Sequence, residues 1–355
     1  MILTRQARKF LLLLIIASAI FNFSFLEYNN YKIRQANPAN TERNAGSLVH
    51  GQTVFSIDNE YYLSPVDNYL AGKGWKRGAA VSNGDYFRRV PGYSIVYLVF
   101  VKAFGQESAH WWLKIFQLLL FLSSIPVVYY LSRLIANELA SRITTTVYAF
   151  IPFISSWAYF TLTESISPIL TLFYVFFALK GKIAEEEKSK LVNYVLASFF
   201  LIGAVLTRPY IAIAGIILFV FATNDYLLRN RTLERVFRFS LVWLIPVMLL
   251  GAWTVRNYVI TKEVVLLEKA YHPQSLDRMK PEFRGMFTFT KSWGEDGAKF
   301  TLYHEPFFWP AVAGDTNSAP IHNILKSWPA YVINDFGYDR LYNILKEHQA
   351  VIASY

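Results

Sequence analysis

The sequence contains no cysteine among its 355 residues. Disulfide bonds, thiolate nucleophiles and cysteine-ligated metal sites are therefore excluded. Charged residues are also scarce, at 17%, whereas hydrophobic residues make up 54% and aromatic residues 17%. One soluble core of this length would need less apolar mass, so the composition favours a membrane protein.

The sequence also lacks the residue patterns of a histidine metal site and of a nucleic-acid surface. Its six histidines include no pair separated by three residues, a spacing typical of metal sites on helices. The 35 Lys and Arg outnumber the 25 Asp and Glu, but they stand in small groups between apolar runs rather than in one stripe. This distribution fits orientation in a bilayer better than contact with nucleic acid.

The N-terminus predicts a first membrane span. Arg5, Arg8 and Lys9 precede an apolar run over residues 10–26, which as a helix covers ~25 Å at about 1.5 Å per residue. Residues 17–19 (Ala-Ser-Ala) resemble a signal-peptide cleavage site, but the apolar run continues past them. A retained span is therefore favoured over a cleaved signal peptide, and its basic flank predicts a cytoplasmic N-terminus.

Six further apolar runs predict crossings that alternate in direction. They cover residues 112–134, 143–160, 166–179, 191–207, 210–223 and 239–255. Residues 93–104 form a shorter apolar run that carries Lys102, which predicts a helix in the membrane interface. The predicted fold class is an all-α polytopic membrane protein, a helical bundle with about seven transmembrane helices.

The polar stretch at residues 27–92 predicts a large extracytoplasmic first loop with interfacial helices. Residues 1–256 then form a transmembrane module, and residues 257–355 form an extracytoplasmic C-terminal region of mixed structure. Because each crossing changes the side of the membrane, counting the crossings from the N-terminus puts five charged residues on the extracytoplasmic side. Ionisable residues at span ends tend to face a cavity and carry function. The five charged residues are Asp58, Arg89, Glu164, Arg208 and Arg256.

Six short motifs follow one another along the predicted extracytoplasmic segments. They read Asp-Asn-Glu-Tyr-Tyr from Asp58, Tyr-Leu-Ala-Gly-Lys-Gly-Trp from Tyr69, Arg-Val-Pro-Gly-Tyr from Arg89, Thr-Glu-Ser from Thr163, Leu-Thr-Arg-Pro from Leu206, and Ala-Trp-Thr-Val-Arg-Asn-Tyr from Ala252. In this order they resemble the GT-C superfamily of membrane glycosyltransferases. The nearest resemblance is to its family 39-like branch, which includes protein mannosyltransferases and aminoarabinose transferases.

The resemblance covers residues 58–258 and has two departures. Ala252 stands where the family often has proline, and the chain stops in the extracytoplasmic tail, whereas many members continue through several more spans. A short member and a truncated chain both fit this pattern.

The resemblance implies transfer of a sugar from a polyprenyl phosphate to an acceptor hydroxyl or amine, with inversion at the anomeric carbon. It places the catalytic aspartate of the family at Asp58, where it would act as general base within hydrogen-bond reach of the acceptor. A helix N-cap or a solvated loop acid is the alternative role for Asp58. The acceptor would be a lipid, a glycan or a protein.

Arg89, Arg208 and Arg256 are the expected ligands of the donor phosphate, because a guanidinium offers a planar fork of donors to phosphate oxygens. Arginines at span ends also extend to lipid head groups, which is the alternative for each. Glu164 is expected either to cap the following helix or to act in catalysis, by orienting the acceptor or by binding a divalent metal ion together with Asp58.

The expected location is a cell-envelope membrane, with the bacterial cytoplasmic (inner) membrane favoured and the active site on its periplasmic or extracytoplasmic face. The expected partners are the polyprenyl-phosphate-linked sugar, the acceptor and the bilayer, with no nucleic acid. Two alternative functions stay open, a transporter or flippase for a lipid-linked anion and a non-catalytic membrane assembly subunit. The first would call for charge at the midplane and paired half-repeats, and the sequence has neither.

Overall fold

The computed structural model describes residues 4–36, 59–76, 86, 89–228 and 232–267, and each structural statement below concerns these residues. They belong to a compact unit, Met1–Lys269. A second unit, Ala270–Tyr355, lies outside the described residues, and so does the predicted base Asp58.

The described residues form helices and turns, with no strand among them. The longer helices are α1 (Arg5–Ala36), α6 (Gln106–Ile135), α9 (Ser167–Ile183), α10 (Glu187–Val205), α11 (Gly215–Thr223) and α12 (Leu233–Thr261). The shorter elements are α4 (Asn59–Leu70), α5 (Gly92–Phe104), α7 (Glu138–Phe150), α8 (Pro152–Ser155), η2 (Ser156–Tyr159), η3 (Thr163–Ser165), η4 (Pro209–Ala214) and the π-helix η5 (Asn224–Leu228).

Six helical segments among the described residues are long and apolar enough to cross a membrane. They are Arg5–Phe25, Gln106–Ile135, Thr163–Ile183, Glu187–Thr207, Pro209–Leu228 and Leu233–Thr261. This confirms the predicted all-α polytopic membrane protein. The short apolar helix expected at residues 93–104 is α5, which begins at Gly92.

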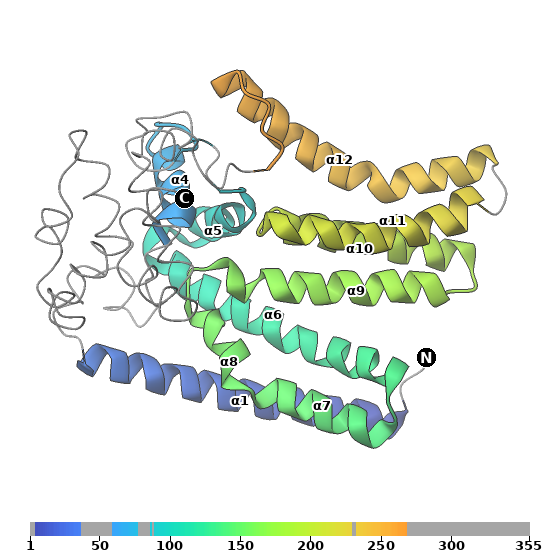
Figure 1. Ribbon diagram of the computed structural model, residues 1–355. Coiled ribbons are helices and arrows are strands. Elements are labelled where there is room, and N and C mark those ends of the chain that lie inside the picture. The colour runs from blue at the N-terminus through green and yellow to red at the C-terminus, as the bar shows by residue number, and fades with distance from the viewer. Residues whose placement is uncertain (1–3, 37–58, 77–85, 87–88, 229–231, 268–355) are drawn as a thin grey trace, which may run out of the picture. The chain divides into compact units, whose positions relative to one another are not determined.

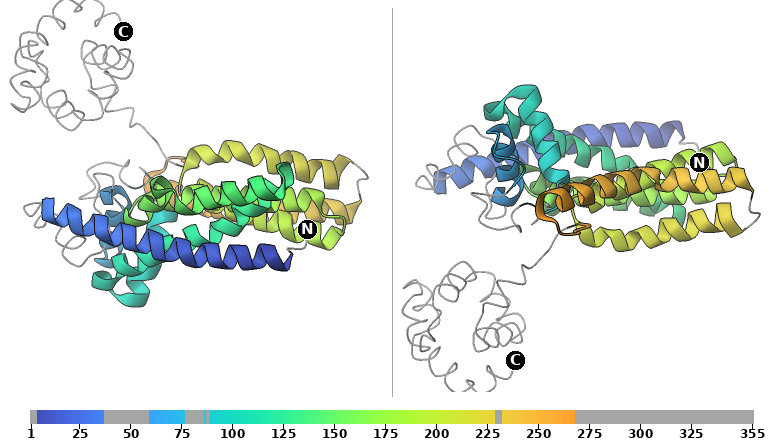
Figure 2. Two further views of the ribbon diagram at one scale, coloured as in Figure 1. Left: turned by 90° about the horizontal axis from the view of Figure 1, so that it is seen from below. Right: turned by 90° about the horizontal axis from the view of Figure 1, so that it is seen from above.

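The long helices lie side by side and alternate in direction (Figures 1 and 2), so the turns between them fall at two ends of the bundle. One end carries α4, α5, η3 and the turn between α10 and η4, and we call it the site end. The opposite end carries the start of α1 and the turns that join α6 to α7, α9 to α10 and η5 to α12. Glu164, Arg208 and Arg256 therefore share the site end, as the parity of the crossings predicts.

The crossing predicted at residues 143–160 differs from the prediction, because it is not one continuous helix. α7 ends at Phe150, and α8 and η2 follow as separate short pieces. Pro152 explains the break, since a proline disfavours helical backbone in the residue before it, and Ile151 is extended with φ −74° and ψ 112°. The broken segment packs along α6 from Glu138, which accepts a hydrogen bond from Tyr129, to Phe160, whose carbonyl accepts one from Gln117.

The first helix continues ten residues beyond the predicted end of its span, because α1 runs to Ala36 rather than Leu26. Ser18 and Asn22 are buried and attach α1 to α7, where both side chains donate to the carbonyl of Ala149, at 2.7 and 2.9 Å. Hydrogen bonds of this kind hold helices together in a bilayer, where burial of apolar surface gives little preference for helix over lipid. These contacts attach residues 18–22 of α1 to the rest of the bundle.

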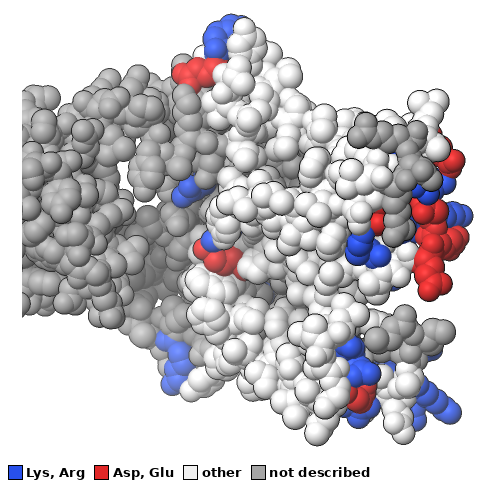
Figure 3. All heavy atoms as spheres, turned by 45° about the vertical axis from the view of Figure 1, so that its right-hand side comes forward, with Lys and Arg blue, Asp and Glu red and all other residues white. Residues whose placement is uncertain are grey.

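The side surface of the described bundle is apolar and its charges gather at the two ends (Figure 3). Large hydrophobic side chains on this surface are exposed, for example Leu13, Phe219 and Val247 at 67%, 52% and 65%. Such a surface suits contact with lipid. At the opposite end, the buried Asp225 on η5 accepts from Lys182 on α9 at 2.9 Å and from Tyr194 on α10 at 2.6 Å, which ties three helices together there.

Candidate functional site

Arg208 and Glu164 form an ion pair at the site end, although 44 positions separate them in the chain. The Arg208 Nε also donates to Thr163 Oγ1 at 2.8 Å, and one of its terminal nitrogens donates to the Tyr210 hydroxyl at 3.0 Å. The two charged side chains are partly exposed, at 27% for Arg208 and 32% for Glu164. These contacts together hold the Arg208 side chain in one orientation. Because a guanidinium has five N–H donors, Arg208 still has donors to offer a ligand.

The local sequence places Arg208 in extended backbone between two helical segments. α10 ends at Val205, and Arg208 has φ −143° and ψ 104° because Pro209 follows it. Burial lowers the pKa of Arg208, but the Tyr210 hydroxyl and the Glu164 carboxylate raise it, and the net result is a pKa above the usual value. Arg208 therefore stays a permanent cation at the end of the spans.

Arg89 reaches the same end through the start of α5. The Gly92 N–H donates to the Leu206 carbonyl at 2.7 Å, two residues before Arg208, and Arg89 lies three residues before Gly92. The Arg89 guanidinium lies 5.2 Å from the centre of the Tyr61 ring, in a cation–π contact with α4. The structure thus brings the segments of Arg89 and Arg208 together.

Arg256 has a different environment from the other two arginines. Its terminal nitrogens donate to the backbone carbonyls of Trp75 and Tyr86 and to Asn257 Oδ1. The guanidinium also lies over the Trp253 and Tyr86 rings, at 4.9 and 5.9 Å from their centres. These contacts join the end of α12 to the segment after α4, which the sequence did not indicate, while the expected role of Arg256 at the donor phosphate stays a prediction.

The expected partners of Glu164 in catalysis are not placed by the structure. Asp58 directly precedes α4 in the chain but lies outside the described residues. Among the residues that the structure describes, no group of three or more histidine, aspartate or glutamate side chains is arranged to hold a metal ion. The observed partners of Glu164 are Arg208, in the ion pair, and the Thr163 hydroxyl, which donates to Glu164 Oε2 at 3.3 Å.

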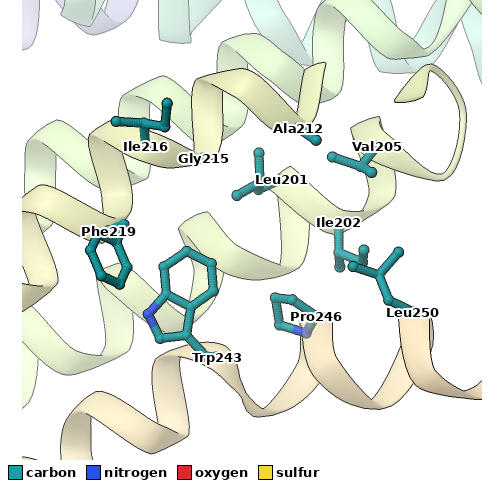
Figure 4. Close-up of a pocket in the computed structure, with 10 residues that line it drawn as sticks. All are labelled: Leu201, Ile202, Val205, Ala212, Gly215, Ile216, Phe219, Trp243, Pro246 and Leu250. Atoms are coloured by element: carbon teal, nitrogen blue, oxygen red, sulfur yellow. The ribbon is translucent and has the colours of Figure 1, made fainter. Parts of the chain in front are cut away.

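An apolar cavity of about 240 Å³ lies between α10, η4, α11 and α12, and Figure 4 shows the side chains that line it. These residues are Leu201, Ile202, Val205, Ala212, Gly215, Ile216, Phe219, Trp243, Pro246 and Leu250. Val205 precedes Arg208 by three residues and Ala212 follows it by four. Arg208 therefore lies in the turn that joins the α10 and η4 sides of the cavity.

The residues 91–263 match the model of the Alg9-like mannosyltransferase family. This family is of the GT-C type, so the match is consistent with a GT-C membrane glycosyltransferase. The match indicates an enzyme that uses a lipid-linked sugar donor. It covers the cavity and three of the predicted site residues, Glu164, Arg208 and Arg256, but neither Asp58 nor Arg89. No curated protein and no solved structure matches the chain significantly.

The narrower assignment of this glycosyltransferase to the family 39-like branch stays a prediction, because the matching family is a different one of the GT-C type. Sequence analysis also missed one residue of the site end, Gln117 on α6, which is fully buried and contacts both α5 and η3. A lone amide inside an apolar run was the available signal, since polar residues within spans are costly and tend to be functional.

Proposed function

We propose that the chain transfers a sugar from a polyprenyl phosphate to an acceptor on the extracytoplasmic face, with inversion at the anomeric carbon. The observation that carries the proposal is the position of the Arg208–Glu164 pair, at the end of the spans and on the turn between two segments, α10 and η4, that line an apolar cavity. A lipid-linked donor needs this combination, because its phosphate must meet a cation near water while its chain stays in an apolar volume.

In the proposed reaction the acceptor oxygen or nitrogen attacks the anomeric carbon while the bond from this carbon to the phosphate oxygen breaks. Asp58 takes the proton of the acceptor, and the released polyprenyl phosphate carries one more negative charge than the donor did. Arg208 faces this charge as it develops. A preoriented cation stabilises such a transition state without further reorganisation.

Glu164 is proposed to orient Arg208 rather than to react itself. Together with Thr163 and Tyr210 it fixes the plane of the guanidinium, which leaves the remaining N–H donors directed by the protein and not by water. Because Glu164 neutralises much of the charge of Arg208, Arg89 is proposed to add a second cation for the phosphate. Arg256 is proposed to hold the first loop beside this site through its carbonyl contacts.

The proposed orientation puts the site end outside and the N-terminus in the cytoplasm. At the opposite end, lysines and arginines stand beside the starts and ends of the spans, for example Arg142, Lys180, Lys182 and Arg238. Basic residues next to spans are retained on the cytoplasmic side, which supports a site on the extracytoplasmic face. A bacterial cytoplasmic membrane is the proposed location.

The test is transfer from a panel of radiolabelled polyprenyl-phosphate sugars by membranes that contain the wild-type chain or Asp58→Asn. Labelled product from the wild type alone would support the reaction and the base together. Product from both chains would support the transfer and remove Asp58 as the base. Absence of product from both, with normal insertion and with polyprenyl phosphate still bound, would favour a non-catalytic assembly subunit.

A further inference from the structure

We infer that Gln117 is the positioning residue of this site, a buried amide on α6 that fixes the η3 turn and the start of α5 around Arg208. The inference rests on the proposed function, in which Arg208 binds the donor phosphate. Gln117 itself contacts neither Arg208 nor any group that would touch the sugar, so its role is to hold the residues that do.

Gln117 is fully buried, and its amide makes four contacts with three other segments of the chain. Its Oε1 lies 2.8 Å from the Tyr93 hydroxyl on α5 and 2.6 Å from the Ser165 hydroxyl on η3. Its Nε2 donates to the carbonyls of Ala158 and Phe160, at 2.8 and 3.2 Å. A primary amide has two N–H donors and two acceptor lone pairs, so each of these sites faces a partner, although the Ser165 hydroxyl shares its one proton with the Leu162 carbonyl, also at 2.6 Å.

The contacts also fix which way the amide points. The carbonyls of Ala158 and Phe160 can only accept hydrogen bonds, so Nε2 must face them, and Oε1 must then face the hydroxyls of Tyr93 and Ser165. An unsatisfied amide inside a span would be strongly destabilising, because no water is there to replace its hydrogen bonds. Full pairing removes this cost and makes one arrangement of the three segments much more stable than others.

Two short paths lead from Gln117 to Arg208. On the first, Ser165 belongs to the same 3-10 turn as Thr163, whose Oγ1 accepts from Arg208 Nε at 2.8 Å. On the second, Tyr93 follows Gly92, whose N–H donates to the carbonyl of Leu206 at 2.7 Å, two residues before Arg208. A shift of the amide would therefore move both the acceptor of Arg208 and the turn that carries it.

The same helix supplies a matched control. Ser124 lies seven residues after Gln117 on α6, is fully buried and also makes a hydrogen bond to another element, at 2.6 Å to the Tyr148 hydroxyl on α7. In the described part of the chain its hydrogen-bond partners are the Phe121 carbonyl and the Tyr148 hydroxyl, neither of which belongs to η3 or α5. Loss of its hydroxyl thus removes a buried interhelical hydrogen bond without touching the segments around Arg208.

The experiment measures the affinity of the purified full chain for a polyprenyl phosphate, together with its thermal midpoint, in wild type, Gln117→Met, Ser124→Ala and Arg208→Ala. Methionine keeps the approximate shape of glutamine and removes its hydrogen bonds. We expect Gln117→Met to weaken binding by about tenfold or more, since small misplacements of binding groups have effects of this size. Ser124→Ala should lower the thermal midpoint while binding stays within about twofold of wild type.

A double variant separates positioning from general stability. If Gln117 acts through Arg208, then Gln117→Met combined with Arg208→Ala should bind no more weakly than Arg208→Ala alone. The inference would be overturned if the double variant lost affinity by the product of the two factors measured in the single variants. Wild-type affinity in Gln117→Met beside lost affinity in Arg208→Ala would also overturn it and leave the proposed function intact.

Two further variants keep the test decisive if Gln117→Met does not fold. Ser165→Ala and Tyr93→Phe each remove one hydroxyl from the Gln117 Oε1 and leave the glutamine in place. We expect each to weaken binding of the polyprenyl phosphate, with the larger loss in Ser165→Ala because its turn contacts Arg208 directly. Unchanged affinity in both would overturn the inference, and unchanged affinity in Arg208→Ala would overturn the proposed function together with it.

Discussion

The backbone N–H of Gly92 donates to the carbonyl of Leu206 at 2.7 Å, and a Cβ atom at position 92 would lie 2.4 Å from that same oxygen. The start of α5 and the turn after α10 are therefore in contact through backbone alone. Glycine is required here by space and not by its backbone angles, because any larger residue would separate α5 from the turn that carries Arg208.

Substitution of this glycine should affect both stability and donor binding. We expect Gly92→Ala to destabilise the chain by about 1–3 kcal/mol, because a backbone carbonyl cannot move aside as a side chain can. Gly251→Ala is the matched control, since a Cβ there meets nothing within 4 Å, and it should be neutral or stabilising by about 0.5–1 kcal/mol. Thermal unfolding in detergent compares the two, and equal midpoints would show that the contact with Leu206 is unimportant.

Arg208 should contribute to donor binding through both its charge and its shape. We expect Arg208→Ala to weaken binding of a polyprenyl phosphate at least about tenfold, the loss of a charged hydrogen bond of roughly 1.5–3 kcal/mol. Arg208→Lys should lose much less, because the ammonium keeps the charge without the fork of donors. Direct binding measurements on the purified chain distinguish the variants.

The control for this prediction is Arg238→Ala at the opposite end of the bundle. Arg238 is also an ion-paired arginine, with Glu187 and Glu234 as its partners, but it is far along the helices from Arg208. The Arg238→Ala variant should bind the polyprenyl phosphate as the wild type does. Equal and negligible effects of Arg208→Ala and Arg208→Lys would remove Arg208 as a phosphate ligand.

The succession of spans was predictable from the sequence because apolar length and basic flanks reflect the thickness and polarity of a bilayer. These same rules brought Glu164 and Arg208 to one end. The interruption between residues 143 and 160 was not foreseen, since hydropathy averages over a window and does not register that Pro152 prevents a continuous helix.

The contacts of the site end depend on tertiary structure that periodicity does not encode. The motif of Arg256 predicts a phosphate ligand, and it gave no indication of the contacts with the carbonyls of Trp75 and Tyr86, which lie 181 and 170 positions away. Gln117 lies in none of the motifs, and its proposed positioning role can be inferred only from the three segments that its side-chain amide contacts in the folded chain. Residue type and parity predict which end a side chain occupies, but not its partner.

Asp67 on α4 should make the stability of the chain depend on pH. Burial raises the pKa of this carboxyl above its usual value. The folded state then holds the proton more tightly than the unfolded state, so stability falls as the pH rises from the unfolded pKa through the raised folded pKa. Asp67→Asn avoids this loss and keeps an Oδ1 for Gln106 Nε2, which donates to Asp67 at 3.2 Å.

We therefore expect Asp67→Asn to raise the thermal midpoint at neutral pH and to have no such advantage near about pH 3, below the ordinary pKa of aspartate. Thermal unfolding of both chains across this range is the measurement. A gain of the same size at both pH values would assign the effect to packing, and a loss at neutral pH would contradict the raised pKa of Asp67.

The apolar cavity should contribute to the binding of the lipid chain and not to that of the phosphate alone. Ala212 lines the cavity four residues after Arg208, so Ala212→Phe would put a ring where the first part of the chain is proposed to lie. Displacing one or two methylene groups at ~0.8 kcal/mol each should weaken binding of a long polyprenyl phosphate by about four- to fifteen-fold. Inorganic phosphate, which has no lipid chain, should bind as it does to the wild type.

Ile213→Phe gives the matched control, because Ile213 is the next residue of η4, is 73% exposed and does not line the cavity. It adds an aromatic ring to the outer surface and should leave both affinities unchanged. Equal weakening of polyprenyl phosphate and inorganic phosphate by Ala212→Phe would mean that the ring disturbs Arg208, since only the phosphate is common to the two ligands. Unchanged binding of the long ligand would exclude the cavity as the site of its chain.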